Sequence, residues 1–345
     1  MNIASIVGTR PQFLKLSPLC DYLRHNQTNI KHIIIHSGQH FDDNMSKALF
    51  KQLKIPKPNV HIRRNNKSRE INFGNMLHQF RQHLQRNLIN KVIVYGDCDT
   101  TLAGAMAANS LGLPVIHVEA GMRSFNKNMP EEINRILTDN VSNLLLCPHQ
   151  HAVDNLHNEN IINNVHLVGN LQVELIHNSL NKVKKNNRKK FSLLTIHRDY
   201  NTNSYSLKYI LDKLSKVQTK FIFPIHPRTK NIIETNSIRI PSNIIVKEPF
   251  SYFDMLQHLY QCDYVVTDSG GLQLESWYLG KKCVVMRTET EWCDAISSGV
   301  CALYDYTTGL DQFIQSHINS PVTRCYELPV NTSELIVKHV VDYHD

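Results

Sequence analysis

Residues 91–121 read KVIVYGDCDTTLAGAMAANSLGLPVIHVEAG, and this stretch decides the fold. Two short apolar, β-branched runs at 91–95 and 114–118 flank a longer stretch at 101–111 with helical spacing. A strand, a helix and a second strand in succession form the unit from which parallel sheets are built. Polar residues and glycine follow both strands, at the edge where open α/β sheets bind ligands. The stretch therefore predicts a parallel α/β domain with a ligand site at that edge.

The same alternation of strands and helices continues in both directions along the 345 residues. The other strand candidates are residues 2–7, 32–36, 144–147 and 166–168 in the first half, and 191–196, 220–225, 243–246, 264–267, 283–286 and 302–303 in the second. A basic run at 182–190, KVKKNNRKK, separates the two series. Single hydrophobic cores stop growing at about 250–300 residues, so two domains are expected.

The expected fold class is α/β, with two Rossmann-like doubly wound parallel-sheet domains facing a cleft in the GT-B arrangement. We expect residues 1–170 to form the first domain and residues 171–330 to form the second. Residues 331–345 show the spacing of a final helix, and we expect this helix to cross back to the first domain.

Composition excludes several classes of protein. Hydrophobic residues make up 41% of the chain and charged residues 20%, as in ordinary globular proteins. No window approaches the ~20 apolar residues of a membrane span, and no signal peptide is evident at the N-terminus. The eight cysteines are scattered without a CxxC pair, and no HExxH or HxH motif stands out. Reduced thiols, no metal site and a soluble, cytoplasmic protein are therefore expected.

The formal net charge of +8 is compatible with nucleic acid, an anionic surface or a phosphorylated small ligand as partner. The densest basic run, at 182–190, has no interleaved aromatic residues, which single-strand binding platforms require. We therefore expect a phosphorylated small molecule as the partner, with no role for nucleic acid or membrane.

Three carboxylates follow strand candidates of the first half or open a helix beside them. Asp97 and Glu119 each follow a strand, and Glu131 lies in the first turn of a helix beginning at Pro130. Taken singly, Asp97 is more simply a helix cap and Glu131 a complement to a helix dipole. Together they would meet at one sheet edge, where like charges raise one another's pKa and make a carboxyl available as acid or base near neutral pH.

Cationic and glycine-rich turns follow other strands. Arg10 and Lys15 come after the first strand and can face an anion near a helix N-terminus, and Gln39 and His40 come after the second. In the second half, His197 and Arg198 follow one strand and His226 the next. The turn Ser269-Gly270-Gly271 opens a helix, as a diphosphate cradle of backbone N–H groups does, and Glu275 one turn later could accept hydrogen bonds from ribose hydroxyls.

These segments, taken in order, resemble the non-hydrolysing UDP-N-acetylglucosamine 2-epimerase family from Gly8 to about Gly299. The segments that carry the resemblance are GTRPQ (8–12), SGQHFD (37–42), YGDCDTT (95–101), HVEAGMRSFN (117–126), PEEINR (130–135), GNLQVE (169–174), HRDYN (197–201), HPR (226–228), TDSGGLQLE (267–275) and TETEW (288–292). So many ordered matches make the resemblance specific.

The resemblance implies roles for individual residues. Asp97, Glu119, Glu131 and His197 match the family's active-site positions, while Arg10, Lys15 and Arg198 match positions that hold substrate. Ser269, Gly270 and Gly271 match the phosphate loop, Glu275 the ribose-binding glutamate, and His226 the nucleotide-facing strand end. Gln39 and His40 lie where some bacterial members bind a second UDP-sugar. Arg123 and Arg287 complete the expected substrate contacts.

The chain departs from the family pattern at Tyr200, where a carboxylate is usual, and at Glu174, Leu274 and Thr288. Tyr200 puts the geometry of the loop after His197 in doubt. The forms RSFN-x-x-MPEEINR and TEW are similar to the subgroup that includes UDP-2,3-diacetamido-glucuronate 2-epimerases. The resemblance therefore implies the reaction type and leaves both substrates open.

The implied activity interconverts UDP-N-acetylglucosamine and UDP-N-acetylmannosamine. Its C2 proton is not acidic, so the resemblance implies anti elimination of UDP to a 2-acetamidoglucal, followed by re-addition after protonation on the other face. No cofactor is required, and a homodimer is the family expectation. The alternatives are a 2-epimerase for UDP-2,3-diacetamido-glucuronate or another modified UDP-sugar, a GT-B glycosyltransferase, and a non-catalytic nucleotide-sugar binding protein.

Overall fold

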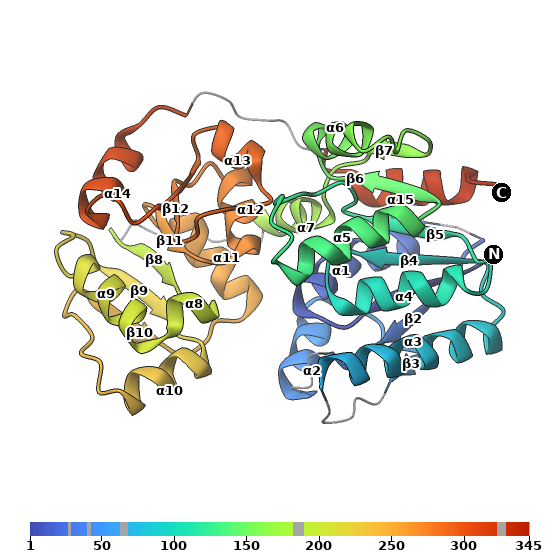
Figure 1. Ribbon diagram of the computed structural model, residues 1–345, viewed down its shortest axis with the longest axis horizontal. Helices are drawn as coiled ribbons and strands as arrows, with labels where there is room; N and C mark the ends of the chain where they lie inside the picture. Colours follow the sequence, from blue (N-terminus) through green and yellow to red (C-terminus); the bar gives the residue numbers. More distant parts are fainter. Residues whose placement is uncertain (27–28, 40–42, 63–67, 182–189, 323–328, 345) are drawn as a thin grey trace. The chain divides into compact units, whose positions relative to one another are not determined.

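The computed structural model describes residues 1–26, 29–39, 43–62, 68–181, 190–322 and 329–344. The chain divides into two compact units, which are described separately below (Figure 1). Unit 1 comprises Met1–His177 and Leu328–Asp345, and unit 2 comprises Asn178–Glu327. None of the described helices is long and apolar enough to cross a membrane.

Unit 1 contains a seven-stranded parallel sheet in the order β3-β2-β1-β4-β5-β6-β7. Its strands are β1 (Asn2–Val7), β2 (Lys31–His36), β3 (Val60–His61), β4 (Lys91–Tyr95), β5 (Val115–Val118), β6 (Leu144–Cys147) and β7 (Val165–Leu167). Its helices are α1 (Arg10–His25), α2 (Asp43–Gln52), α3 (Arg69–Arg86), α4 (Asp99–Asn109), α5 (Pro130–Val141), α6 (Gln150–Asn158), α7 (Leu171–Leu180) and α15 (Thr332–Asp342). The boundary between the units lies within α7.

Unit 2 contains a six-stranded parallel sheet in the order β10-β9-β8-β11-β12-β13. Its strands are β8 (Ser192–Thr195), β9 (Phe221–Pro224), β10 (Ile244–Lys247), β11 (Val265–Thr267), β12 (Cys283–Val285) and β13 (Cys301–Leu303). Its helices are α8 (Asp199–Thr202), α9 (Ser204–Leu214), α10 (Pro227–Thr235), α11 (Tyr252–Gln261), α12 (Gly270–Tyr278), α13 (Cys293–Ser297) and α14 (Leu310–Asn319).

The prediction of two doubly wound parallel sheets is confirmed. Strand β3 was missed, because two residues carry no readable alternation. In both sheets the strand order reverses once, between β1 and β4 in unit 1 and between β8 and β11 in unit 2. Loops at such a switch point diverge to opposite faces of the sheet and leave a crevice for ligands. The two reversals therefore indicate where a ligand site is expected in each unit.

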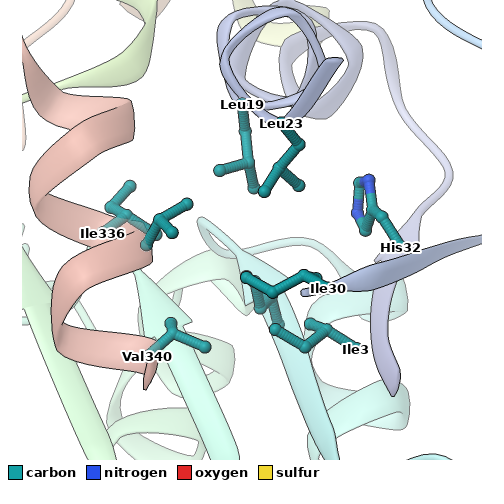
Figure 2. A pocket seen from close by; sticks show the side chains of 9 residues that line it. Ile3, Leu19, Leu23, Ile30, His32, Ile336 and Val340 are labelled. Carbon is teal, nitrogen blue, oxygen red and sulfur yellow. The ribbon is translucent and has the colours of Figure 1, made fainter. Parts of the chain in front are cut away.

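The unit 1 sheet is buried on both faces. Ala4 and Ile6 of β1 point to the face covered by α3 and α4 and join the core there. Alternate residues such as Ile3 point to the other face, where they line a small apolar cavity with Leu19 of α1 and Ile336 of α15 (Figure 2). Continuous apolar strands of this kind are typical of parallel sheets covered on both sides.

A polar chain crosses three strands within this apolar layer. His32 Nε2 lies 2.7 Å from Ser5 Oγ, which lies 2.7 Å from the hydroxyl of Tyr95. Burial lowers the pKa of His32 to about 4, so its ring is neutral at physiological pH. Because each of these three side chains has a hydrogen-bond partner, the series fixes Tyr95 at the end of β4. The loop that carries Asp97 begins there.

Candidate active site

Glu119 lies at the carboxyl end of β5 with a backbone φ of +73°, which is unusual for a residue other than glycine. Its Oε1 accepts a 2.6 Å hydrogen bond from Lys15 Nζ, and its Oε2 accepts a 3.2 Å bond from Asn170 Nδ2. The Lys15 and Glu119 side chains are only 8% and 11% exposed. Hydrogen bonds to both oxygens of the Glu119 carboxylate fix its orientation.

Gly96 brings the loop after β4 against this ion pair. Its φ is +65°, and a Cβ at this position would lie 3.1 Å from Lys15 Nζ and 3.4 Å from Glu119 Oε1. A side chain here would be strained and would press on both groups, so glycine is required. Helix α1, which follows β1, and the loops after β4 and β5 therefore converge at the same edge of the sheet.

Asp97 follows Gly96 and pairs with Arg135 of α5, whose other terminal nitrogen lies 3.0 Å from Glu132 Oε2. Asn134, next to Arg135, donates to the backbone oxygen of Asp97 at 2.9 Å. Helix α5 thus holds the Asp97 loop through two neighbouring residues, and the Asp97 side chain remains 30% exposed. A partly exposed carboxylate beside a cation suits proton transfer to a bound molecule.

Glu131 is the second residue of α5 and half-buried. It lies close enough to Arg69 to help raise the pKa of that guanidinium, although the main cause is the hydrogen bond from Arg69 to Asp99. Arg69 Nε donates to Asp99 Oδ2 at 2.8 Å, and Asn134 links Asp99 to the Asp97 loop. Loop contacts and charge therefore connect all three predicted carboxylates to the same end of unit 1.

Other predicted residues of unit 1 have different surroundings. Arg10 is the first residue of α1 and half-buried. The side-chain oxygen of Gln39 accepts bonds from Thr100 N at 3.1 Å and Thr100 Oγ1 at 2.6 Å, which hold it at the start of α4. His40 lies outside the described residues.

Arg123 is 1% exposed and bonded to acidic groups on two sides. It donates to Asp139 at 2.7 Å and to both oxygens of Glu159 at 2.7 and 2.6 Å. These bonds to the buried Asp139 and the more exposed Glu159 occupy donors of Arg123 and indicate a structural role, and a contact with substrate stays a prediction.

A buried pair behind the carboxylates was missed by the sequence analysis. His117 Nδ1 lies 2.6 Å from Asp139 Oδ1, and His117 Nε2 lies 2.8 Å from the backbone oxygen of Gly96. Burial would raise the pKa of Asp139, but the opposing His117 and Arg123 outweigh it and the pKa is lowered. The pair supports the loop before Asp97 from inside the sheet.

In unit 2, the buried carboxylate of Asp268 organises the loop after β8. It accepts bonds from His197 N at 3.0 and 3.1 Å, from Arg198 N at 2.9 Å and from Asn201 Nδ2 at 3.2 Å. His197 Nδ1 lies 3.1 Å from Asp268 Oδ1, which leaves the other ring nitrogen for a ligand. Asp268, directly before Ser269, was quoted in the sequence but given no role.

The turn after β11 opens α12, with Ser269 as its N-cap accepting from Leu272 N. A Cβ on Gly270 would lie 2.8 Å from Glu291 Oε1 and 3.7 Å from Arg287 Nη1. Arg287 is 3% exposed, and it pairs with Glu291 at 3.2 Å through Nη2, while its buried Nη1 has no hydrogen-bond partner. A helix N-terminus and a buried guanidinium with a spare donor are groups that can bind an anion.

The remaining predicted residues of unit 2 lie in α12, at the cap of α10 and in the loop after β8. Glu275 lies in α12 and is 5% exposed. His226 caps α10, and its ring centroid is 6.5 Å from that of His197. Burial raises the pKa of Tyr200, and the nearby Arg287 and Arg198 act against this rise, so Tyr200 also belongs to this cationic region.

Comparison with known proteins supports one family. A family model described as UDP-N-acetylglucosamine 2-epimerase matches residues 23–321. The UDP-2,3-diacetamido-2,3-dideoxy-D-glucuronate 2-epimerase of Pseudomonas aeruginosa is 38% identical over 314 residues, covering 88% of each chain. The UDP-N-acetylglucosamine 2-epimerase of Methanocaldococcus jannaschii is 36% identical over 320 residues, covering 87% of each chain.

A solved structure agrees with the sequence comparisons. The crystal structure of Methanocaldococcus jannaschii UDP-GlcNAc 2-epimerase in complex with UDP-GlcNAc and UDP superposes with a TM-score of 0.89 at 33% identity, covering 99% of each chain. Because the family match, the identities and the fold all extend over most of its length, the chain belongs to the UDP-N-acetylglucosamine 2-epimerase family.

Proposed function

We propose that this protein is a non-hydrolysing 2-epimerase that interconverts UDP-N-acetylglucosamine and UDP-N-acetylmannosamine. The observation that carries the proposal is the Glu119 carboxylate held between Lys15 and Asn170 at the sheet edge of unit 1, beside the loop of Asp97. Unit 2 adds an anion site at Gly270 and Arg287. Relatives that act on UDP-N-acetylglucosamine, at 36% identity, support this substrate class.

The reaction would proceed in two steps, an elimination and a re-addition. A carboxylate of unit 1 removes the C2 proton while the bond between C1 and the diphosphate oxygen breaks, and UDP leaves with the electron pair. The resulting 2-acetamidoglucal then accepts a proton at C2 on the opposite face, and the UDP oxygen adds to C1. Asp97, Glu119 and Glu131 are the proposed proton carriers.

The unit 2 residues would stabilise the departing diphosphate. Backbone N–H groups at the start of α12, with Arg287 and the His197–Arg198 loop, would bind the negative charge where it develops. Asp268 orients this loop through its hydrogen bonds to His197 N and Arg198 N. The other parts of UDP are proposed to be bound by Ser269, Gly271, Glu275 and His226.

A second substrate has specific support. The Pseudomonas aeruginosa relative, at 38% identity, acts on UDP-2,3-diacetamido-2,3-dideoxy-D-glucuronate by its name. The same elimination and re-addition would serve that sugar, because the chemistry occurs at C1 and C2. The substituents at C3 and C6 therefore separate the two substrates.

The test is NMR of the purified protein with each UDP-sugar in D2O and no acceptor. We expect a mixture of 2-epimers in which the product carries solvent deuterium at C2. A glycosyltransferase would leave the sugar unchanged without acceptor, and a binding protein would bind UDP in calorimetry without turnover. Product without deuterium would exclude the proposed elimination.

Two further proposals concern the whole protein. We propose a homodimer, which the family resemblance implies, and analytical ultracentrifugation at micromolar concentration would test it. We also propose a cytoplasmic location, which the scattered cysteines favour.

A further inference from the structure

Among the residues that the structure describes, Lys15 of α1 and Asn170 are the side chains that hydrogen-bond to the Glu119 carboxylate. Asn170 immediately precedes α7, the helix within which the chain passes from unit 1 to unit 2. We infer that Asn170 is a positioning residue for Glu119, tying the orientation of this carboxylate to α7. The kinetic effects expected below rest on the proposed function, whereas the contact between Asn170 and Glu119 does not.

The orientation of the Asn170 amide is fixed by its two bonds. Its Oδ1 accepts from Gln172 N at 2.8 Å, as a cap of α7 does, so Nδ2 must be the atom that faces Glu119 Oε2 at 3.2 Å. Asn170 is 3% exposed, so water does not compete with these bonds. A flip of the amide would bring an oxygen against the carboxylate and leave Gln172 N without its acceptor.

Within the described part of the chain, one oxygen of the Glu119 carboxylate would have a hydrogen-bond donor if Asn170 were absent. Lys15 binds Oε1, and a side chain bound through one oxygen can still rotate about its last bond. Asn170 binds the second oxygen and fixes the plane of the carboxylate. A group that moves a proton to one defined face of a sugar requires this precision, because small misplacements cost large factors in rate.

Helix α7 is itself fastened within unit 1. Glu174 Oε2 accepts a 2.7 Å hydrogen bond from Ser333 N at the start of α15. A Cβ on Gly169, whose φ is +87°, would lie 2.8 Å from Thr332 Oγ1 and 2.9 Å from Pro329 Cβ. The segment that carries Asn170 is thus held against the segment by which the chain returns to unit 1, and any displacement of α7 acts on Glu119.

Asn170→Asp is the sharpest test, because it keeps the volume and the α7 cap while replacing the donor by a carboxylate oxygen. We expect kcat to fall at least about tenfold with KM nearly unchanged, because Asn170 does not contact substrate. We also expect the acidic limb of the pH–kcat profile to move to higher pH, since a second carboxylate faces Glu119. Wild-type kcat with an unshifted profile would overturn the inference.

Asn170→Ser provides a second variant that retains a helix cap but loses the amide donor. Its kcat should fall without the shift in the pH profile. The matched control is Asn143→Asp. Asn143 directly precedes β6, and its Oδ1 accepts from Val115 N, at the amino end of β5, at 2.9 Å. The kinetics of this control should equal those of the wild type, and equal losses in all three variants would also overturn the inference.

One readout does not depend on turnover. Carboxyl 13C NMR, with the Glu119 signal assigned from its loss in Glu119→Gln, should show Glu119 titrating at higher pH in Asn170→Asp than in the wild type. If the wild type converts no UDP-sugar, the proposed function fails, while this titration still decides the role of Asn170. An unchanged titration would reject the role even in an active epimerase.

Discussion

Asp268 shows how one buried residue arranges the ligand loop of unit 2. Burial alone would raise the pKa of its carboxyl, but hydrogen bonding and the charge of His197, together with the Arg198 and His197 N–H groups, lower it below the usual value. A buried carboxylate that accepts several N–H bonds is stable only while all of them are made. The hydrogen bonds that Asp268 accepts offset the cost of burying its charge, and they also fix the loop after β8.

We expect Asp268→Asn to lower the free energy of unfolding at pH 7 by about 1–3 kcal/mol, because the amide has only one oxygen to accept from these donors. A carboxyl whose pKa is lowered on folding stabilises the folded state above its unfolded pKa, and this contribution is lost as pH falls through the folded pKa. The difference should therefore persist at neutral pH and shrink below about 3.8. Urea unfolding at a series of pH values measures it.

The control is Asp263→Asn. Asp263 is exposed and lies shortly before β11, the strand that Asp268 follows. The free energy of unfolding of this control should match that of the wild type, as for most surface substitutions. Equal stability of Asp268→Asn and wild type at pH 7 would contradict the structural role given to Asp268.

At the scale of elements, helix α15 is held at both ends by charged side chains of unit 1. Glu174 accepts from Ser333 N in its first turn, and Lys91 Nζ donates to the backbone oxygens of Val340, at 2.6 Å, and Tyr343 at the other end. These hydrogen bonds satisfy backbone groups at the two ends of α15 that have no partner within the helix. Between them, Ile336 and Val340 pack over the apolar layer that also contains Leu19 (Figure 2).

We expect Glu174→Gln to be at least as stable as the wild type at pH 7. Burial raises the pKa of Glu174 above 4.5, so the folded protein binds its proton more tightly than the unfolded chain. The free energy of unfolding then falls as pH rises from about 4.5 through the folded pKa. The amide of Gln has no charge to lose, and its oxygen still accepts from Ser333 N.

Thermal or urea unfolding at pH 4 and pH 7 tests this, with Glu174→Ala as the matched variant. Glu174→Ala leaves a buried N–H without its acceptor and should cost about 1–3 kcal/mol at either pH. If Glu174→Gln is destabilised as much as Glu174→Ala at pH 7, the charge rather than the hydrogen bond holds α15, contrary to this account.

At the scale of the whole molecule, the sequence predicted those features that a local pattern of residues encodes, chiefly the strands. The runs at 91–95 and 144–147 became β4 and β6 without change of bounds, because buried parallel strands are short apolar runs between turns. The contact of Asn170 with Glu119 spans 51 residues, and no spacing rule reports such a contact. The ion pairs of Arg123 with Asp139 and Glu159 were likewise not readable from the sequence.

The two units are expected to divide the reaction between them, and variants can separate their parts. Asp97→Asn and Glu131→Gln in unit 1 should each reduce kcat at least about 100-fold, the usual contribution of a general acid or base. Their affinity for UDP should remain near that of the wild type, because UDP without its sugar offers these carboxylates no group to bind.

Arg287→Met in unit 2 should instead lower the affinity for UDP. Methionine retains the apolar stem but removes the buried charge beside Gly270, and losing one charge-assisted contact should weaken UDP binding about tenfold or more. Calorimetry with UDP and steady-state kinetics on the same preparations measure both effects, and circular dichroism shows whether each variant is folded. If the carboxylate variants lost UDP affinity as Arg287→Met does, the carboxylates would be nucleotide contacts, and proton transfer would have to be assigned to other groups.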